Sequence, residues 1–262
     1  MQSIEHQHQQ FRQWNRDGFV VLRSTLSESE KADLARWVEE LAGWPEAPGK
    51  WMKWYEQGSA GRQLCRVEDF VPYHRGLADF LQSSDLTRVL ESLLGEPAAL
   101  FKEKINFKLP GGAGFQPHQD APAFTSFGQS YHVTVMIAVD PTTRDNGCLE
   151  VVEALHGSGL LPQASDGTLQ REWVERQTWK PVEMQPGDVL IFDSYLAHRS
   201  GPNRTQKPRR ALYVTYNRVS AGSHRDAYFQ QKRAAFPPEC ERVQGVDYSK
   251  TAAVYNLGNP IV

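Results

Sequence analysis

The chain has 262 residues, which is long enough to bury a sizeable core, and its 29 basic and 31 acidic residues give a formal net charge of −2. This balance gives no indication of a nucleic-acid-binding surface. No apolar run is long enough to span a membrane, and the polar N-terminus MQSIEHQHQQ lacks the apolar segment of a secretory signal. The three cysteines, Cys65, Cys148 and Cys240, are far apart and form no CxxC motif, as expected of reduced thiols in a cytoplasmic protein.

The N-terminal part of the chain predicts a short strand and two helices. Residues 17–22 have the composition of a turn that enters a strand. Ser27 and Glu30 have the spacing of a capping box and predict the start of a helix, whose apolar stripe consists of Leu34, Trp37, Val38 and Leu41. A second helix is predicted over about residues 84–94, with Gly95 at its end. Both helices are expected to pack on the outside of a β core.

From Leu100 onward the chain indicates short strands separated by turn signals. Apolar alternation or β-branched residues mark strands at residues 101–109, 131–139, 188–192 and 211–217. This pattern is typical of a sandwich or a double-sheet jelly roll. No linker or internal repeat interrupts the chain, so residues 1–262 are predicted to form one domain. The polar tail from Ala221, which carries several aromatic residues, is expected to pack across the entrance of the barrel.

The most informative motif is His118-Gln119-Asp120, followed far downstream by His198. Alone, a carboxylate near a histidine is a weak signal in a chain with 8 histidines and 31 acidic residues, and a solvated loop is its ordinary explanation. Here both parts of the motif follow predicted strands, and strand ends around a barrel mouth are where a metal site needs its ligands. Two imidazoles and one carboxylate predict a facial triad for Fe(II), which leaves the opposite face of the metal open for a cosubstrate and dioxygen.

Arg209 is a candidate to bind a carboxylate near this metal, because guanidinium presents a planar, bidentate fork. Its neighbour Arg210 is the rival. Along a strand, alternation places Arg209 on one face with Tyr213 and Thr215, and Arg210 on the other face with Leu212. The two arginines are therefore expected to point in opposite directions.

Two further runs follow the metal motif in order, DNGCLEVV at residues 145–152 and MQPGDVLIFDSYLAHRSGPN at residues 184–203, and Arg209 comes after them. With these motifs, residues 17–220 resemble the phytanoyl-CoA dioxygenase-like family of Fe(II)/2-oxoglutarate oxygenases. The resemblance implies a mainly β fold, a double-stranded β-helix (jelly roll) with flanking α-helices. It also implies a hydroxylase that uses Fe(II), 2-oxoglutarate and O2, with catalysis at a metal held by His118, Asp120 and His198.

The same resemblance assigns residues to the cosubstrate. Arg209, rather than its neighbour, is expected to pair with the far carboxylate of 2-oxoglutarate. Ser200 is expected to add a hydroxyl to that carboxylate, with a turn role as the alternative. Two further candidate cosubstrate residues come from strand faces rather than from the resemblance: Thr134 shares a face with Met136 after the motif, and Asn106 shares a face with Lys104 before it. Met136 stands where several relatives carry tryptophan, so the cosubstrate pocket is expected to differ in shape from theirs.

The segments KWMKWYE, LFKEKINFKLPGG, RRALYVTYN and YNLGNPI are similar to a bacterial branch of this family that includes 2-aminoethylphosphonate hydroxylases. This similarity implies a small organophosphonate substrate bound by cationic side chains. The candidate substrate-binding residues are Lys104, Lys108, Arg62, Arg66 and Tyr213. The alternative for Lys104 is a solvated position, because lysines on strands are more often at the surface.

Two other functions stay open at this point. Within the class, the substrate is another small metabolite, or an acyl-CoA or lipid, which would need a long apolar channel. Outside the class, the chain is a non-catalytic metal-binding jelly roll that binds a ligand. In each case the expected partner is a small molecule, with no nucleic acid and no membrane. The sequence leaves the oligomeric state open.

Overall fold

Two antiparallel sheets form the body of the protein in a computed structural model that describes residues 4–58, 61–124, 127–129, 131–248, 255 and 261. The larger sheet has the strand order β1-β9-β6-β11-β4-β3-β2, and the smaller has the order β5-β10-β7-β8. The strands of the larger sheet are β1 (Phe19–Leu22), β2 (Met52–Gly58), β3 (Gly61–Glu68), β4 (Ala98–Lys108), β6 (His132–Ala138), β9 (Val189–Asp193) and β11 (Arg209–Arg218). Those of the smaller sheet are β5 (Phe115–His118), β7 (Leu149–Val151), β8 (Lys180–Val182) and β10 (His198–Ser200).

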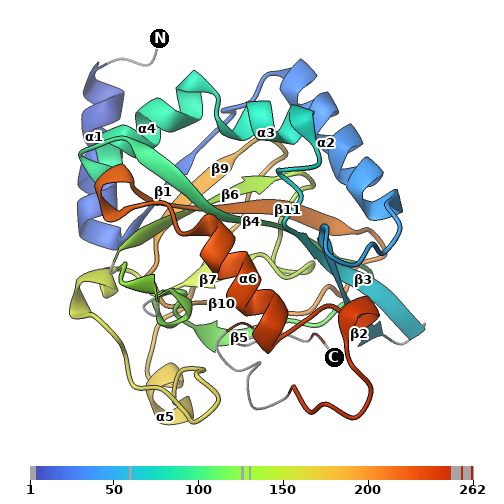
Figure 1. Cartoon of the computed structure of the whole chain (residues 1–262). Coiled ribbons are helices and arrows are strands. Elements are labelled where there is room, and N and C mark those ends of the chain that lie inside the picture. Colours follow the sequence, from blue (N-terminus) through green and yellow to red (C-terminus); the bar gives the residue numbers. More distant parts are fainter. Residues whose placement is uncertain are drawn as a thin grey trace.

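Helices cover one face of the larger sheet. Figure 1 shows α1 (Ile4–Asp17), α2 (Glu28–Gly43), α3 (Arg75–Leu81) and α4 (Ser84–Leu94) gathered on this face, with the smaller sheet on the opposite side. The short helix α5 (Arg171–Val174) lies near the smaller sheet, and α6 (Arg225–Ala235) packs against β4. The molecule is therefore layered, with helices outside, the larger sheet in the middle and the smaller sheet beyond it.

The alternation along β11 shows how the two faces of the larger sheet differ. Leu212, Val214 and Tyr216 join the apolar cluster beneath the helices. Ala211 and Tyr213 belong instead to the cluster between the two sheets. Successive side chains of a strand point to opposite faces, so the outer face provides the apolar core and the inner face can carry polar side chains. Lys104, Asn106 and Arg209 come from this inner face.

The predicted jelly roll and its four strands are confirmed, with strand ends shifted by a few residues. Both predicted helices are also confirmed, as α2 and α4, and Gly95 ends α4 with a positive φ of 76°. Sequence analysis did not identify α1, the β2–β3 hairpin or α6. The last of these lies in the segment that was described only as a polar tail. No helix in the described part of the chain is long and apolar enough to cross a membrane.

The capping box of α2 gives a test of how local sequence stabilises the fold. The backbone N–H of Glu30 donates to Ser27 Oγ at 3.3 Å, and the backbone N–H of Ser27 donates to Glu30 Oε2 at 2.8 Å. Ser27→Ala removes the first of these bonds, and we expect a loss of about 1 kcal/mol in the free energy of unfolding, measured by denaturant titration. Ser83 is the matched control, because it caps α4 without a side-chain hydrogen bond. An equal loss in Ser83→Ala would contradict the capping explanation.

Candidate active site

The two histidines of the motif face each other across a strand pair. His118 ends β5 and His198 begins β10, and the antiparallel register places them directly opposite each other. Asp120 follows at the start of the short 3-10 helix Ala121–Ala123. Gln119 lies between the two ligands of the motif and is fully buried, and its side chain donates to the backbone carbonyls of Gly159 and Tyr195. These bonds hold the loop that presents Asp120.

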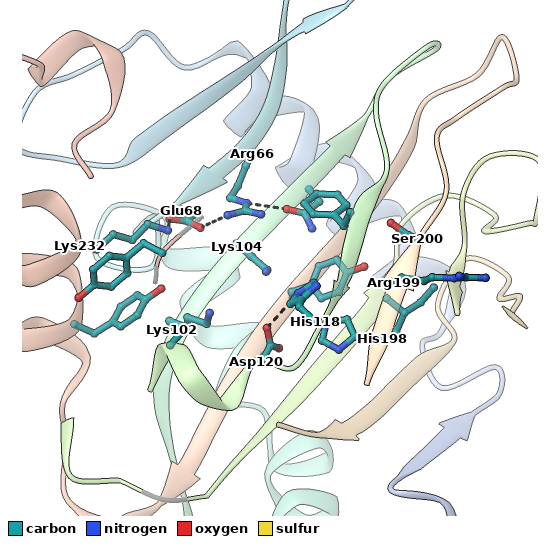
Figure 2. A pocket seen from close by; sticks show the side chains of 17 residues that line it. Arg66, Glu68, Lys102, Lys104, His118, Asp120, His198, Arg199, Ser200 and Lys232 are labelled. Atoms are coloured by element: carbon teal, nitrogen blue, oxygen red, sulfur yellow. Dashed lines mark hydrogen bonds and ion pairs between the residues drawn. The ribbon is translucent and has the colours of Figure 1, made fainter. Parts of the chain in front are cut away.

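The ligand atoms of His118, Asp120 and His198 converge. One nitrogen of each ring and one carboxylate oxygen all lie within 4.8 Å of one another, and the three side chains are buried (Figure 2). The ring centroids of the two histidines are 4.2 Å apart, and His118 Nε2 lies 3.8 Å from Asp120 Oδ1. Two imidazoles and one carboxylate at this spacing fit a divalent transition metal and leave its other positions open.

Hydrogen bonds to backbone carbonyls orient both imidazole rings. His118 Nδ1 lies 2.6 Å from the carbonyl of Gln116, and His198 Nδ1 lies 3.0 Å from the carbonyl of Leu196. A carbonyl only accepts, so Nδ1 carries the hydrogen in each ring and the lone pair of Nε2 is available to a metal.

The electrostatics of the triad suit metal binding. Burial lowers the pKa of His118 to about 3, and the neighbouring His198 adds to the effect. Burial by itself would raise the pKa of Asp120, but His198 and Lys102 outweigh it and hold that pKa below its ordinary value. Near neutral pH the imidazoles are therefore neutral and the carboxylate is ionised, which are the states that bind metals.

Arg209 lies at the inner end of the site with incomplete hydrogen bonding. It is almost fully buried, and its Nη2 donates to the carbonyl of Gly147. Its Nε and Nη1 have no hydrogen-bond partner among the described residues. Leaving buried donors unpaired is costly, so their presence indicates a ligand. The planar fork of guanidinium fits a carboxylate, as the far end of 2-oxoglutarate would supply.

Arg210 points away from the site, as alternation predicts. Its guanidinium pairs with Asp140 at 2.8 Å and with Glu39 of α2 at 2.9 Å, on the helix-covered face of the sheet. The predicted opposition of Arg209 and Arg210 is confirmed. Arg209 is the arginine that faces the space between the sheets, and its pairing with 2-oxoglutarate stays a prediction.

Lys108 lies beside Arg209 and not on the wall of the pocket, which corrects its predicted place. The two residues are paired across β4 and β11. The ammonium of Lys108 donates to Ser200 Oγ at 2.7 Å and to the carbonyls of Gly147 and Gly201. Burial and the neighbouring Arg209 lower the pKa of Lys108 to about 6. Lys108 therefore forms one buried polar group with Arg209 and Ser200.

A pocket of about 600 Å³, including open solvent at its mouth, adjoins the triad (Figure 2). Its lining is unusually polar, with only two aliphatic side chains, Ala123 and Leu149. Four aromatic residues line it, Phe115, Tyr213, Tyr228 and Tyr255. Its charged residues outside the triad are Arg66, Glu68, Lys102, Lys104, Arg199 and Lys232. Asn106 and Ser200 complete the wall beside the triad.

Five of the predicted ligand-binding residues line this pocket: Asn106, Ser200, Lys104, Arg66 and Tyr213. Two others do not. The prediction for Arg62 is wrong in its location, since its side chain is 43% exposed and pairs with Glu46 and Glu239. Thr134 is buried outside the pocket wall, where its hydroxyl bonds that of Thr215 at 3.1 Å. Met136 packs in the apolar cluster between the sheets.

Sequence analysis missed four charged residues of the pocket: Glu68, Lys102, Arg199 and Lys232. Glu68 Oε2 accepts a hydrogen bond from Lys232, and its Oε1 accepts from Arg66 at 3.2 Å. Burial would raise the pKa of Glu68, but these two cations bring it to about 2. The alternation of β4 could have identified Lys102, which shares a face with Lys104 and Asn106. No local signal links Glu68 to Lys232.

Comparisons with known proteins agree with this geometry. A family model described as phytanoyl-CoA dioxygenase (PhyH) matches residues 14–211. A 2-aminoethylphosphonate dioxygenase from uncultured bacterium HF130_AEPn_1 is 49% identical over 251 residues, which cover 95% of this chain and 96% of the relative. A methylphosphonate hydroxylase from Gimesia maris is 44% identical over 227 residues, which cover 87% of this chain and 86% of the relative.

The fold is also similar to solved structures. EctD from S. alaskensis, crystallised with 2-oxoglutarate and 5-hydroxyectoine, has a TM-score of 0.70 at 22% identity and covers 81% of this chain and 76% of its own. At this identity the likeness supports the jelly-roll fold. The family model and the two curated relatives carry the assignment further: the chain belongs to the phytanoyl-CoA dioxygenase (PhyH) family and is a dioxygenase that uses Fe(II), 2-oxoglutarate and O2.

Proposed function

We propose that this enzyme hydroxylates an unactivated C–H bond of a small organophosphonate, 2-aminoethylphosphonate or a close analogue. The observation that carries the proposal is the lining of the pocket, where five cationic side chains and only two aliphatic ones adjoin the triad. An anionic, compact substrate matches such a wall, and an acyl chain does not. The names of the two curated relatives support the same substrate class.

The residues near the triad have different roles in this reaction. We propose that His118, Asp120 and His198 hold Fe(II), which activates O2 with electrons from 2-oxoglutarate. Arg209 pairs with the far carboxylate of the cosubstrate, and the hydroxyl of Ser200 donates to it. The buried wall of the pocket orients the C–H bond of the substrate and limits the access of water.

Asn106 and Thr134 differ in the hydrogen-bonding capacity that they can offer to a cosubstrate. Asn106 lines the pocket, and its Oδ1 accepts from Arg66 at 3.0 Å, so its amide N–H₂ remains to donate to a bound carboxylate. Thr134 has a partner in Thr215, and we do not retain it as a cosubstrate residue.

Cys65, Cys148 and Cys240 are all free thiols, which supports the proposed cytoplasmic location.

The metal assignment gives the first test of this proposal. His118→Ala, Asp120→Ala and His198→Ala each remove one of three protein ligands, so we expect each variant to lose bound Fe(II) and succinate formation while the chain stays folded. Iron content, succinate yield and circular dichroism measure these three properties. Near-wild-type turnover in any of the folded variants would refute the assignment of that ligand.

The two arginines give a second test with a built-in control. Arg209→Ala leaves the cosubstrate's far carboxylate without its cation, and loss of one partner of a buried charge pair costs about 3–5 kcal/mol. We expect the apparent KM for 2-oxoglutarate to rise about a hundredfold or more. Arg210→Ala lies on the other face of the same strand and should change this KM little. The opposite ranking would show that the cosubstrate does not bind at Arg209.

The substrate class is tested by coupled turnover. We expect 2-aminoethylphosphonate or methylphosphonate to stimulate succinate formation by the wild-type enzyme, and phytanoyl-CoA to give none above the uncoupled rate. The hydroxylated product should appear in equal amount to succinate by mass spectrometry. Coupled turnover of a long-chain acyl-CoA with inert phosphonates would overturn the substrate proposal and leave the metal assignment unaffected.

A further inference from the structure

The cations of the pocket fall into two groups by their partners. Arg66 bonds Asn106 and Glu68, Lys232 bonds Glu68, and Arg199 bonds Glu150. Lys102 and Lys104 are different. No hydrogen-bond or ion-pair acceptor is found for either ammonium group within the part of the chain that the structure describes. Both side chains line the pocket, so the unpaired donors face its interior.

Aromatic rings hold these two ammonium groups in place. Lys102 Nζ lies 4.4 Å from the ring centroid of Phe124 and 5.4 Å from that of Tyr228. Lys104 Nζ lies 5.3 Å from the ring centroid of Tyr213. A ring face attracts a cation without accepting a conventional hydrogen bond, so the N–H donors of both lysines remain available. The pair is thus positioned before any ligand arrives.

The location of the pair separates it from the cosubstrate end of the site. Lys102 and Lys104 project from the same face of β4, between the Asp120–His118 pair on one side and the Glu68–Lys232 pair on the other (Figure 2). Ser200, which marks the cosubstrate end with Lys108 and Arg209, lies on the far side of His118. A ligand bound to the two lysines would therefore lie next to the metal ligands without occupying the place of 2-oxoglutarate.

We propose that Lys102 and Lys104 together bind the phosphonate group of the substrate and make the pocket selective for a dianionic, tetrahedral head group. This inference rests on the proposed function and assigns its substrate contacts. A phosphonate has three oxygens and up to two negative charges, so it can accept hydrogen bonds from both ammonium groups at once. A sulfonate has the same shape with one charge. The ratio of the affinities for phosphonate and sulfonate therefore measures the contribution of the paired cations.

The wild-type enzyme provides the first measurement. Methylphosphonate and methanesulfonate, or 2-aminoethylphosphonate and 2-aminoethanesulfonate, differ in the charge of a tetrahedral group and little in size. We expect the phosphonate of each pair to bind at least about tenfold more tightly, measured by calorimetric titration of the enzyme loaded with Fe(II) and 2-oxoglutarate in the absence of O2. Equal affinity for phosphonate and sulfonate would overturn the proposal without any mutation.

Substitution of the lysines provides the second measurement. In Lys102→Met and Lys104→Met we expect the KM for 2-aminoethylphosphonate and for methylphosphonate to rise about 10- to 100-fold, and by the same factor for both, because the lysines contact only the group that the two substrates share. The preference for phosphonate over sulfonate should decrease in the same variants. The KM for 2-oxoglutarate should stay near its wild-type value.

Lys53 offers a matched control. It is also buried, but its ammonium donates to the carbonyls of Ala42 and Trp44 and it does not line the pocket. Lys53→Met should leave the phosphonate KM unchanged. Wild-type KM and selectivity in both Lys102→Met and Lys104→Met would refute the inference. Failure of the proposed function looks different, since the wild-type enzyme would then form no succinate with either phosphonate.

Discussion

The register between β4 and β11 is the constraint on which the active site depends. It places Lys108 opposite Arg209 and Lys104 opposite Tyr213, all on the inner face of the larger sheet. A slip of β4 by one residue would turn its inner-face side chains, Lys104 and Lys108, toward the helices. The inner face does not stabilise this register by itself, because it buries cations. The outer face does so through side chains such as Ile105 and Leu212, each worth about 1.5–3 kcal/mol when fully buried.

The cost of burying so many charges is offset only in part within the protein. Glu68 compensates Arg66 and Lys232, and this small ionic cluster also fixes α6 against β3. Aromatic rings offset a smaller part of the desolvation of Lys102 and Lys104. Burial and the nearby cations accordingly lower the pKa of Lys104 well below its ordinary value. A bound anion would relieve this unfavourable field, so affinity for an anion is obtained at the expense of stability in the empty enzyme.

Much of the fold and part of the site could be predicted from the sequence, because both follow from alternation within single strands. The opposite orientations of Arg209 and Arg210 are an example. Arg62 shows where this reasoning fails: strict alternation would place it on the same face as Arg66, but a β-bulge in the β2–β3 hairpin interrupts the register between Trp54 and Tyr55. The pairing of Glu68 with Lys232 joins residues 164 positions apart, and no periodic pattern within one element encodes such a contact.

The division of the cations between two ends addresses a difficulty that any enzyme with two dianionic reactants faces. At an effective dielectric constant of about 20, two like unit charges roughly 8 Å apart repel each other by about 2 kcal/mol, and two dianions present four such pairs. If all the cations formed one cluster, either dianion could bind there in place of the other. Here Arg209 and Lys108 lie near Ser200 at one end, and Lys102 and Lys104 lie on the other side of His118 from Ser200 (Figure 2). Arg209 would then serve one dianion and the two lysines the other, and a metal ion held by His118, Asp120 and His198 would supply further positive charge near both.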